Sequence, residues 1–379
     1  MITSAYRYLS SLAEPYGLTR SLDGLELCRD DCGNPIFSVG NSAVVFKIRH
    51  DGRIRKLRCY TRPKRNLREI YRERLLPAEL FVYTDDNRGE WCDVVIEDWT
   101  EGATLHSEIL RALDNPTRLA ELARMFDAFA LSLLGEEWAH GDLKPENIIV
   151  GTDGVLHAID FDAMYRPGFT ADDCEETGTR AFRHPGSENV FGKEIDDYPI
   201  ALISAALHAL ALDPTLYGRF ERADAMMISP ARAVAGDDPA SAAVERILAA
   251  NGDAAHYRIA RLLHSPRPEL FGLAELLRYA QTPVRTSGEP LQLDECDGRW
   301  GYRDSEGFVI APLYDCGFEF SDSLAAVSIG GQWHFIDETG SVAINCAGCD
   351  AVKPFRNGRA EKIVGRARMA IDTAGKETE

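Results

Sequence analysis

The sequence predicts an α+β protein that ends in a small, β-rich domain, and three observations support this prediction. Residues 36–60 alternate between apolar and polar side chains, as strands do. Residues 196–277 are rich in Ala and Leu and have the pattern of helices. From residue 298 onward a short motif returns about every 33–35 residues, which is typical of small β-units stacked on one another.

Length and charge exclude some classes of protein. The 379 residues suffice for two or three domains, and the net charge of −18 argues against nucleic-acid binding, which needs a basic surface. We interpret the one basic stretch, "KIRHDGRIRKLRCYTRPKRNLREIYRER", as a hairpin and helix that handle a smaller phosphate rather than as a nucleic-acid patch. The nine scattered cysteines favour reduced thiols and a cytoplasmic protein.

The elements follow one another with recognisable boundaries. Residues 1–35 carry no functional signal, and Asp51-Gly52 then predicts a tight hairpin between two strands. A helical pattern follows the proline in "RPKRNLREIYRERLL", and "WCDVVIEDW" reads as a strand. Residues 116–137 show helical spacing. The apolar run "PIALISAALHALALDP" is too short for a membrane span and carries His208, so we expect a buried helix and no membrane segment.

The stretch "AHGDLKPENIIV" crowds polar groups in front of a buried strand. Asp142 and Asn147 lie five residues apart, and Asp160 follows Asn147 after a predicted hairpin of "NIIV" and "VLHAIDF" joined by "GTDG". Because Asn147 precedes one strand and Asp160 closes the other, both are expected at one end of this hairpin. Carboxylate and amide oxygens are hard ligands, suited to Mg²⁺.

These motifs resemble the protein kinase superfamily, with a bilobal protein-kinase-like fold over residues 36–282. His140-Gly141-Asp142-Leu143 with Asn147 is similar to H-R-D-L-x-x-x-N, and Asp160-Phe161-Asp162 to D-F-G. The resemblance implies ATP and Mg²⁺ as cofactors. Asp142 would orient the attacking hydroxyl, Lys144 would neutralise the transferring phosphoryl group, and Asn147 with Asp160 would hold the metal.

The same resemblance assigns residues 36–99 to an N-lobe that binds nucleotide. "FSVGNSAVVFKI" partly matches the phosphate-covering Gly-rich loop through Gly40 and Val45. Either Lys56 or Arg58 fills the role of the strand-three lysine, since both lie on one face of a strand, with Glu69 or Glu73 as the helix partner. Backbone groups from Glu97 to Trp99 would read the adenine.

Residues 100–282 would form the C-lobe. "GTRAFRHPGSE" resembles the end of an activation segment, and Asp196 or Asp197 the aspartate that braces the catalytic loop. His140 is expected to be structural. Two departures stand out: Gly141 replaces the Arg of H-R-D, and Asp162 replaces the Gly of D-F-G, where it either binds a second Mg²⁺ through water or stiffens the turn.

Residues 283–293 read as a linker, and residues 294–379 resemble WG repeats, named for a pair seen here as Trp300-Gly301. The copies are "GRWGYRDSEG", "GQWHFIDETG" and, more faintly, "RARMAIDTAG". We expect Trp300 and Trp333 to be core anchors. The resemblance implies that the repeats bind a protein partner or substrate.

The "DLKPEN" sequence, with a Lys between the Asp and the Asn, resembles Ser/Thr-type protein kinases, and the resemblance therefore implies an ATP- and Mg²⁺-dependent protein kinase of that type. Two alternatives remain open. A small-molecule kinase of the same fold is suggested by His140-Gly141-Asp142, and a pseudokinase scaffold by the uncertain strand-three lysine.

Overall fold

The computed structural model describes residues 4–84, 88–222 and 226–378, and these fall into two compact units. Unit 1 comprises the described residues of 1–102 and 161–176, and unit 2 those of 103–160 and 177–379. Both units combine helices and strands, and the C-terminal part of unit 2 is β-rich. The predicted α+β class and the β-rich C-terminal region are confirmed at this level.

A six-stranded sheet in the order β1-β3-β4-β6-β5, with β2 paired to β3, forms the centre of unit 1. Its strands are β1 (Glu26–Leu27), β2 (Phe37–Val39), β3 (Ala43–His50), β4 (Arg53–Tyr60), β5 (Leu75–Tyr83) and β6 (Gly89–Asp98). The predicted hairpin between β3 and β4 is confirmed. Asp51 and Gly52 have φ values of 48° and 72°, as a type I′ turn requires.

The N-terminal residues cover one face of this sheet. Helix α1 (Ala5–Ala13) packs Tyr8 and Leu12 against alternate residues of the strands, such as Phe46 of β3 and Leu57 of β4. The buried carboxylate of Glu79 on β5 accepts hydrogen bonds from three successive backbone N–H groups, those of residues 20–22. These contacts make the N-terminal segment part of the unit 1 core.

The helix expected after Pro63 is much shorter than its pattern suggests. The structure has only α2 (Leu67–Tyr71) and the 3-10 turn η1 (Arg72–Arg74). Asn66 and Arg72 adopt positive φ values of 56° and 51°, which interrupt the helix at both ends. The leucines that completed the helical pattern belong instead to β5.

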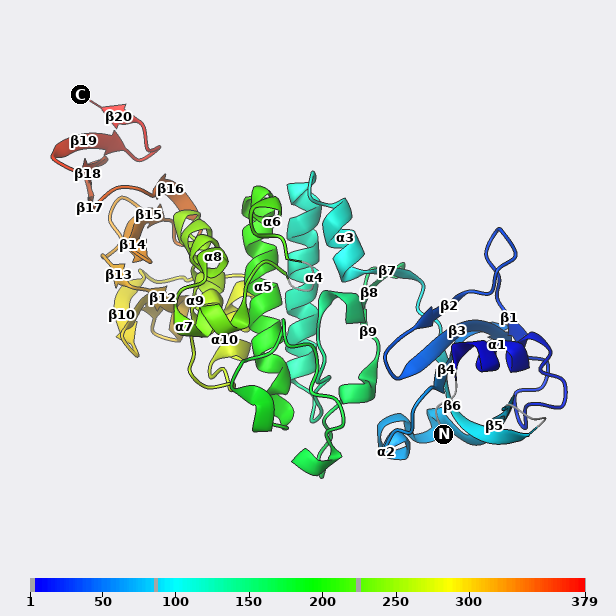
Figure 1. Ribbon diagram of the computed structural model, residues 1–379. Helices are drawn as coiled ribbons and strands as arrows, with labels where there is room; N and C mark the ends of the chain where they lie inside the picture. The colour runs from blue at the N-terminus through cyan, green and yellow to red at the C-terminus, as the bar shows by residue number, and fades with distance from the viewer. Residues whose placement is uncertain (1–3, 85–87, 223–225, 379) are drawn as a thin grey trace. The chain divides into compact units, whose positions relative to one another are not determined.

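Helices form the first part of unit 2 (Figure 1). They are α3 (Leu105–Arg111), α4 (Pro116–Leu134), α5 (Asp197–Leu212), α6 (Thr215–Phe220), α7 (Pro230–Ala235), α8 (Pro239–Ala250), α9 (Ala254–Leu262) and α10 (Leu273–Gln281), with short turns η6 (Ser187–Asn189) and η7 (Lys193–Asp196). Nearly every residue of α5 from Tyr198 to Leu210 is buried. Among the described residues, Lys193–Leu212 is the one helical stretch long and apolar enough to cross a membrane, and 72% of its apolar window is buried inside the protein. It is the central core helix of this unit.

A small sheet in the order β7-β8-β9 carries the polar stretch identified in the sequence. It consists of β7 (Gly102–Thr104), β8 (Ile148–Gly151) and β9 (Leu156–Ala158), and the turn η3 (Pro145–Asn147) leads into β8. The predicted hairpin of β8 and β9 is confirmed by their antiparallel register.

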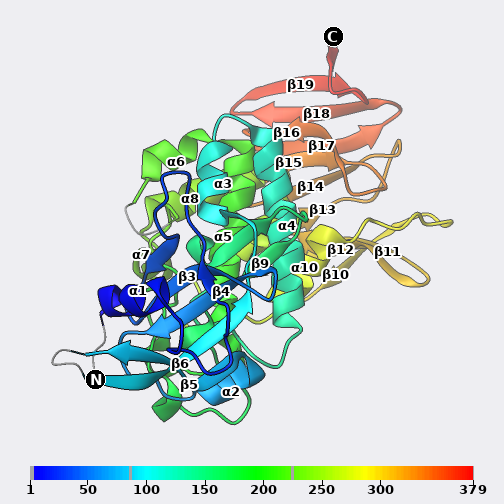
Figure 2. The same ribbon diagram turned by 90° about the vertical axis from the view of Figure 1, so that its right-hand side faces the viewer.

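Three small antiparallel sheets follow the helices, one for each copy of the repeat, and both views show them in succession toward the C-terminus (Figures 1 and 2). Their strands are β10 (Gln292–Cys296), β11 (Arg299–Asp304) and β12 (Gly307–Tyr314); β13 (Cys316–Gly317), β14 (Ala325–Ile329), β15 (Gln332–Ile336) and β16 (Val342–Cys346); and β17 (Ala351–Arg356), β18 (Arg359–Val364), β19 (Ala367–Asp372) and β20 (Glu377–Thr378). The middle sheet is apolar on both faces. Val327 packs with the first sheet and Ala326 with the third. The predicted stacking of β-units is therefore confirmed.

The Trp-Gly pair of the first copy has a packing explanation. Trp300 packs against the core shared by the first and second sheets, and Trp333 packs against the core shared by the second and third sheets. A Cβ atom on Gly301 would lie 2.6 Å from the backbone oxygen of Ile310 and 2.8 Å from the Cα atom of Pro312, so only glycine fits where the strands approach. Both tryptophans are anchors of the β-core, as expected.

The repeats are bonded to the helices of the same unit. The imidazole of His334 lies 2.8 Å from the carbonyl oxygen of Ala249, and the guanidinium of Arg258 donates to the carbonyl of Leu313 and to Asp315. In the preceding segment, Arg285 forms an ion pair with Asp304. The segment expected to be a linker is thus fastened to the first repeat.

Candidate functional site

The loop that precedes β8 is held in place by the buried carboxylate of Asp196. Asp196 accepts hydrogen bonds from the backbone N–H groups of His140 at 2.5 Å and Gly141 at 3.0 Å. Burial raises the pKa of Asp196, and its hydrogen bonds with this loop only partly offset that rise. Asp197, the other candidate for this role, accepts the Leu270 N–H instead. The brace expected from the sequence is therefore Asp196.

His140 has the structural role expected of it. Its side chain is buried, Nδ1 accepts from the N–H of Asp142 at 3.3 Å, and Nε2 lies 2.9 Å from the carbonyl oxygen of Ile159. Since Nδ1 accepts, the proton resides on Nε2, which donates to that carbonyl. The ring thus ties the loop to the segment just before Asp160.

Asp142 is surrounded by donors. Its carboxylate accepts from the backbone N–H of Thr179 at 2.5 Å, from the amide of Asn147 at 3.1 Å, and lies 3.1 Å from the ammonium of Lys144. Burial alone would raise the pKa of Asp142, but the charge of Lys144 and the bonds from Thr179 outweigh it, and the pKa lies below its ordinary value. The side chain is ionised at neutral pH.

Asn147 and Asp160 meet at the same end of the hairpin, as the sequence predicted. The N–H of Ile159 donates to the carbonyl of Asn147 at 2.9 Å, which extends the β8–β9 ladder to the residue before Asp160. The amide nitrogen of Asn147 faces two acceptors of Asp142, the carbonyl and the carboxylate. Its Oδ1 atom is therefore the one left to act as a ligand, and Asp160 adopts a left-handed φ of 68° beside it.

Thr179 is a site residue that the sequence interpretation missed. Its hydroxyl accepts from Lys144 at 2.7 Å while its N–H reaches Asp142, so one residue holds both groups. Gly178, with φ of 71°, permits this approach, because a Cβ atom there would lie 2.4 Å from the carbonyl oxygen of Gly141. The Gly-Thr pair in "ETGTRAF" was the available signal.

In unit 1, the two candidate strand-three cations have different partners. Lys56 lies 2.9 Å from Glu97, its cross-strand neighbour on β6, and Glu97 also pairs with Arg74 at 2.6 Å. Arg58 is buried and pairs with Asp162 at 3.0 Å. Glu69 is exposed on α2 and makes no ion pair with a described residue. The cations expected to pair with Glu69 or Glu73 of the helix are therefore paired with Glu97 and Asp162 instead.

Asp162 is fully occupied by protein donors. Besides Arg58, it accepts from the hydroxyl groups of Tyr60 at 2.9 Å and Tyr71 at 2.6 Å, and all four side chains are buried. This network fixes the turn η4 (Phe161–Ala163) to β4 and α2. Of the two interpretations of Asp162, the geometry favours a stiffened turn over a second metal site.

The remaining candidates for nucleotide binding lie on the hairpin and at the end of β6. Gly40 closes the β2–β3 turn through a hydrogen bond from its N–H to Ala43, and Val45 is half-buried on β3. The ring of Trp99 lies 4.6 Å below the ammonium of Lys47, which also pairs with Glu101.

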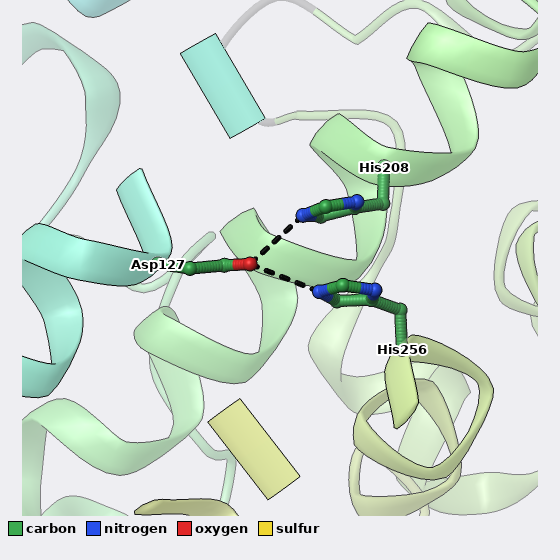
Figure 3. Close-up of side chains that lie close together, drawn as sticks. All are labelled: Asp127, His208 and His256. Carbon is green, nitrogen blue, oxygen red and sulfur yellow. Dashed lines mark hydrogen bonds and ion pairs between the residues drawn. The ribbon is translucent and has the colours of Figure 1, made fainter. Parts of the chain in front are cut away.

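A second polar cluster lies inside the helical part of unit 2 (Figure 3). One carboxylate oxygen of Asp127, on α4, lies 2.8 Å from Nε2 of His208 on α5 and 2.9 Å from Nε2 of His256 on α9. The other carboxylate oxygen accepts a hydrogen bond from the hydroxyl of Ser204. His256 also faces Asp253 through Nδ1 at 2.8 Å. Two histidines and a carboxylate this close are a candidate metal centre by composition.

The geometry of the cluster instead fits an ion-pair network. The two imidazole rings are stacked, with centroids 3.3 Å apart and planes 16° apart. A metal bound to both Nε2 atoms would lie outside both ring planes, away from the nitrogen lone pairs. Burial would lower the pKa of His256, but Asp253 and Asp127 raise it to about 10. A protonated His256 offers donors rather than lone pairs, so we assign the cluster to helix packing.

The comparisons with known proteins concern the repeats. No curated protein matches the chain. The family model described as "WG containing repeat" matches residues 300–333, which run from Trp300 on β11 to Trp333 on β15, and this segment of the chain is accordingly a WG repeat.

Proposed function

We propose that the chain is an ATP- and Mg²⁺-dependent phosphotransferase that acts on a Ser or Thr hydroxyl of a protein. The observation that carries the proposal is the set of contacts among Asp142, Lys144, Asn147 and Thr179. It supplies an ionised carboxylate to orient a hydroxyl and a cation at hydrogen-bond distance from it. Phosphoryl transfer depends on positioning and charge stabilisation of this kind.

Mg²⁺ fits the donor set of the second unit. The Oδ1 atom of Asn147 and the carboxylate of Asp160 are hard oxygen ligands at one end of the hairpin. These two residues would hold Mg²⁺, which when bound would supply charge stabilisation for a phosphate group. The carboxylate of Asp142, held by Thr179, Asn147 and Lys144, would orient the acceptor hydroxyl.

Nucleotide contacts in unit 1 are part of the same proposal. Gly40 and Val45 would cover the phosphates, and backbone groups from Glu97 to Trp99 would read the base. We assign the strand-three role to Lys56, because Arg58 is buried with Asp162 inside the unit, whereas Lys56 is only partly buried. The WG repeats would bind the protein substrate or a partner.

A radiolabelled γ-phosphate assay with ATP and Mg²⁺ tests the proposal. We expect label on the protein or on an added generic protein, and its loss in Asp160→Ala. Asp142→Asn should lower turnover by at least about 100-fold while nucleotide binding persists, since the base contributes only to the chemical step. The control is Asp23→Asn, an exposed carboxylate with no described partner. Equal labelling by wild type and Asp142→Asn would refute the assignment.

A scaffold without transferase activity is the second candidate, and one observation favours it. Both candidate strand-three cations of unit 1 are engaged with carboxylates, Lys56 with Glu97 and Arg58 with Asp162. A protein that shows neither transfer nor a Mg²⁺-dependent thermal shift with ATP would be such a scaffold. ATP binding with label on a sugar or choline acceptor alone would instead identify a small-molecule kinase.

A further inference from the structure

A large cavity in unit 2 opens beside Thr179. It has a volume of about 880 Å³, and its wall is formed by residues 177–181, by Arg183 and Arg222, and by residues 228–231 just before and within α7. One wall residue, Thr179, is bonded directly to Asp142 and Lys144. A ligand in the cavity therefore lies next to the proposed acceptor site within the same compact unit.

The wall is strongly basic for such an acidic protein. It carries three arginines, Arg180, Arg183 and Arg222, and a single carboxylate, Glu188, whereas the whole chain has a net charge of −18. Arg183 donates to the backbone carbonyl of Thr177. Within the described part of the chain, the guanidinium groups of Arg180 and Arg222 have no hydrogen-bond or ion-pair partner, and both residues are exposed.

This contrast separates the cavity arginines from the cations that were candidates for transfer or nucleotide binding. Lys144 is neutralised by Asp142, and Lys56, Arg58 and Arg74 each have a carboxylate partner. Arg180 and Arg222 keep their donors available, and guanidinium groups bind carboxylates and phosphates through paired, charge-assisted hydrogen bonds. The cavity thus offers an anion site that is large enough for a side chain of a bound peptide together with the adjacent peptide residues.

We propose that this cavity recognises an anionic side chain that flanks the acceptor hydroxyl on the substrate polypeptide, either a carboxylate or a phosphoserine phosphate. The proposal rests on the proposed function, because it places the substrate chain beside Asp142. It assigns Arg180 and Arg222 to substrate selection, separate from the residues proposed for transfer. Acidic or previously phosphorylated segments would be the preferred substrates.

Fluorescence anisotropy with labelled serine peptides tests this directly and needs no turnover. Four peptides share one serine and differ in flanking residues: glutamates, phosphoserines, alanines or lysines. We expect the anionic peptides to bind at least about tenfold more tightly than the alanine peptide, given what hydrogen bonds between charged groups contribute. High salt should reduce this preference. Comparing the affinities of the glutamate and phosphoserine peptides shows whether the cavity prefers a carboxylate or a phosphate.

Variants assign the preference to the cavity. Arg180→Ala combined with Arg222→Ala should abolish it, and Arg180→Glu with Arg222→Glu should shift it toward the lysine peptide. The matched control is Arg246→Ala, which removes an exposed arginine of α8 that has no described partner and does not line the cavity. Equal binding of glutamate and alanine peptides, or an anionic preference that survives the double alanine variant, would overturn the proposal.

Phosphate transfer to the same peptides separates this proposal from the proposed function. An anionic binding preference without transfer keeps the cavity assignment and rejects the transferase. Transfer at equal rates to all four peptides keeps the transferase and rejects the cavity assignment. A selective transfer to anionic peptides that is lost only in the double variant supports both.

Discussion

Thr179 connects the two groups on which the proposed chemistry depends. Its N–H holds the carboxylate of Asp142 and its hydroxyl accepts from Lys144, 35 residues earlier in the chain. The backbone contact does not depend on the side chain, whereas the contact with Lys144 does. A substitution at this position can therefore remove the hydroxyl contacts while the backbone contact with Asp142 is kept.

Thr179→Val keeps the shape of the side chain and removes the hydroxyl, which accepts from the Lys144 ammonium and also bonds with the Asp142 carboxylate, while the backbone N–H contact with Asp142 remains. We expect turnover to fall roughly tenfold to a hundredfold, the range that a small misplacement of a catalytic group produces. Nucleotide affinity should be unchanged. Thr179→Ser is the matched control, because it retains the hydroxyl, and steady-state phosphorylation rates compare the two. Equal rates for the Val and Ser variants would exclude a role for this hydroxyl.

His256 predicts a pH dependence of stability. Its folded-state pKa is raised from 6.5 to about 10, so its charged pair with Asp127 and Asp253 stabilises the fold fully below pH 6.5. That stabilisation is lost as the pH rises through about 10. We expect the free energy of unfolding by urea to fall more between pH 7 and 10.5 in wild type than in His256→Gln. Parallel pH profiles would show that the histidine is not charged in the folded protein.

The residues that were predictable from the sequence are those whose neighbours lie close in the chain. Asp142, Lys144 and Asn147 sit in one loop, and a single hairpin brings Asp160 beside Asn147. The partners of Asp162 lie 91 to 104 residues away, and those of Asp127 77 to 129 residues away. Periodicity shows that such side chains are buried without showing what they meet.

At the scale of elements, the turn η4 is held to the unit 1 sheet by one buried ion pair. Arg58 comes from β4 and Asp162 from η4, while Tyr71 of α2 donates to the same carboxylate. The short helix α2 is thereby fixed in position although it has little more than one turn. Residue types could not reveal this, because Asn66 and Arg72 end the helix through backbone conformations that their side chains do not require.

Arg58→Met should destabilise unit 1 by about 3–5 kcal/mol, because Asp162 would be left buried without its cation. Thermal or urea unfolding measures the change. Arg65→Ala is the control: Arg65 is an exposed arginine 3.5 Å from Glu175, and such pairs contribute about 0–1 kcal/mol. In a double-mutant cycle with Asp162→Ala, the effects should be strongly non-additive. Additive losses would mean that the two side chains do not interact.

On the scale of the whole molecule, the C-terminal repeats belong to the same compact unit as the helices and the candidate site. Ala249, Ala254 and Tyr257 of the α8–α9 region share a core with the first two sheets of the repeats. The sequence predicted the repeats from their period and the helices from their composition. It gave no sign that the two share a core, because their contacts join residues 55 to 95 positions apart.

This shared core predicts that the repeats and the helices lose structure together. His334→Ala removes a fully buried side chain and its bond to the end of α8, at a cost of roughly 2–4 kcal/mol, as for other large-to-small core substitutions. Hydrogen exchange should then accelerate in α8 and α9 as well as in β14 and β15. His106→Ala, at a half-exposed histidine of α3, is the control and should leave exchange in these elements unchanged. Faster exchange confined to the strands would show that the repeats form an independent domain, whereas a joint response would show that the repeats and the helices unfold as one cooperative unit.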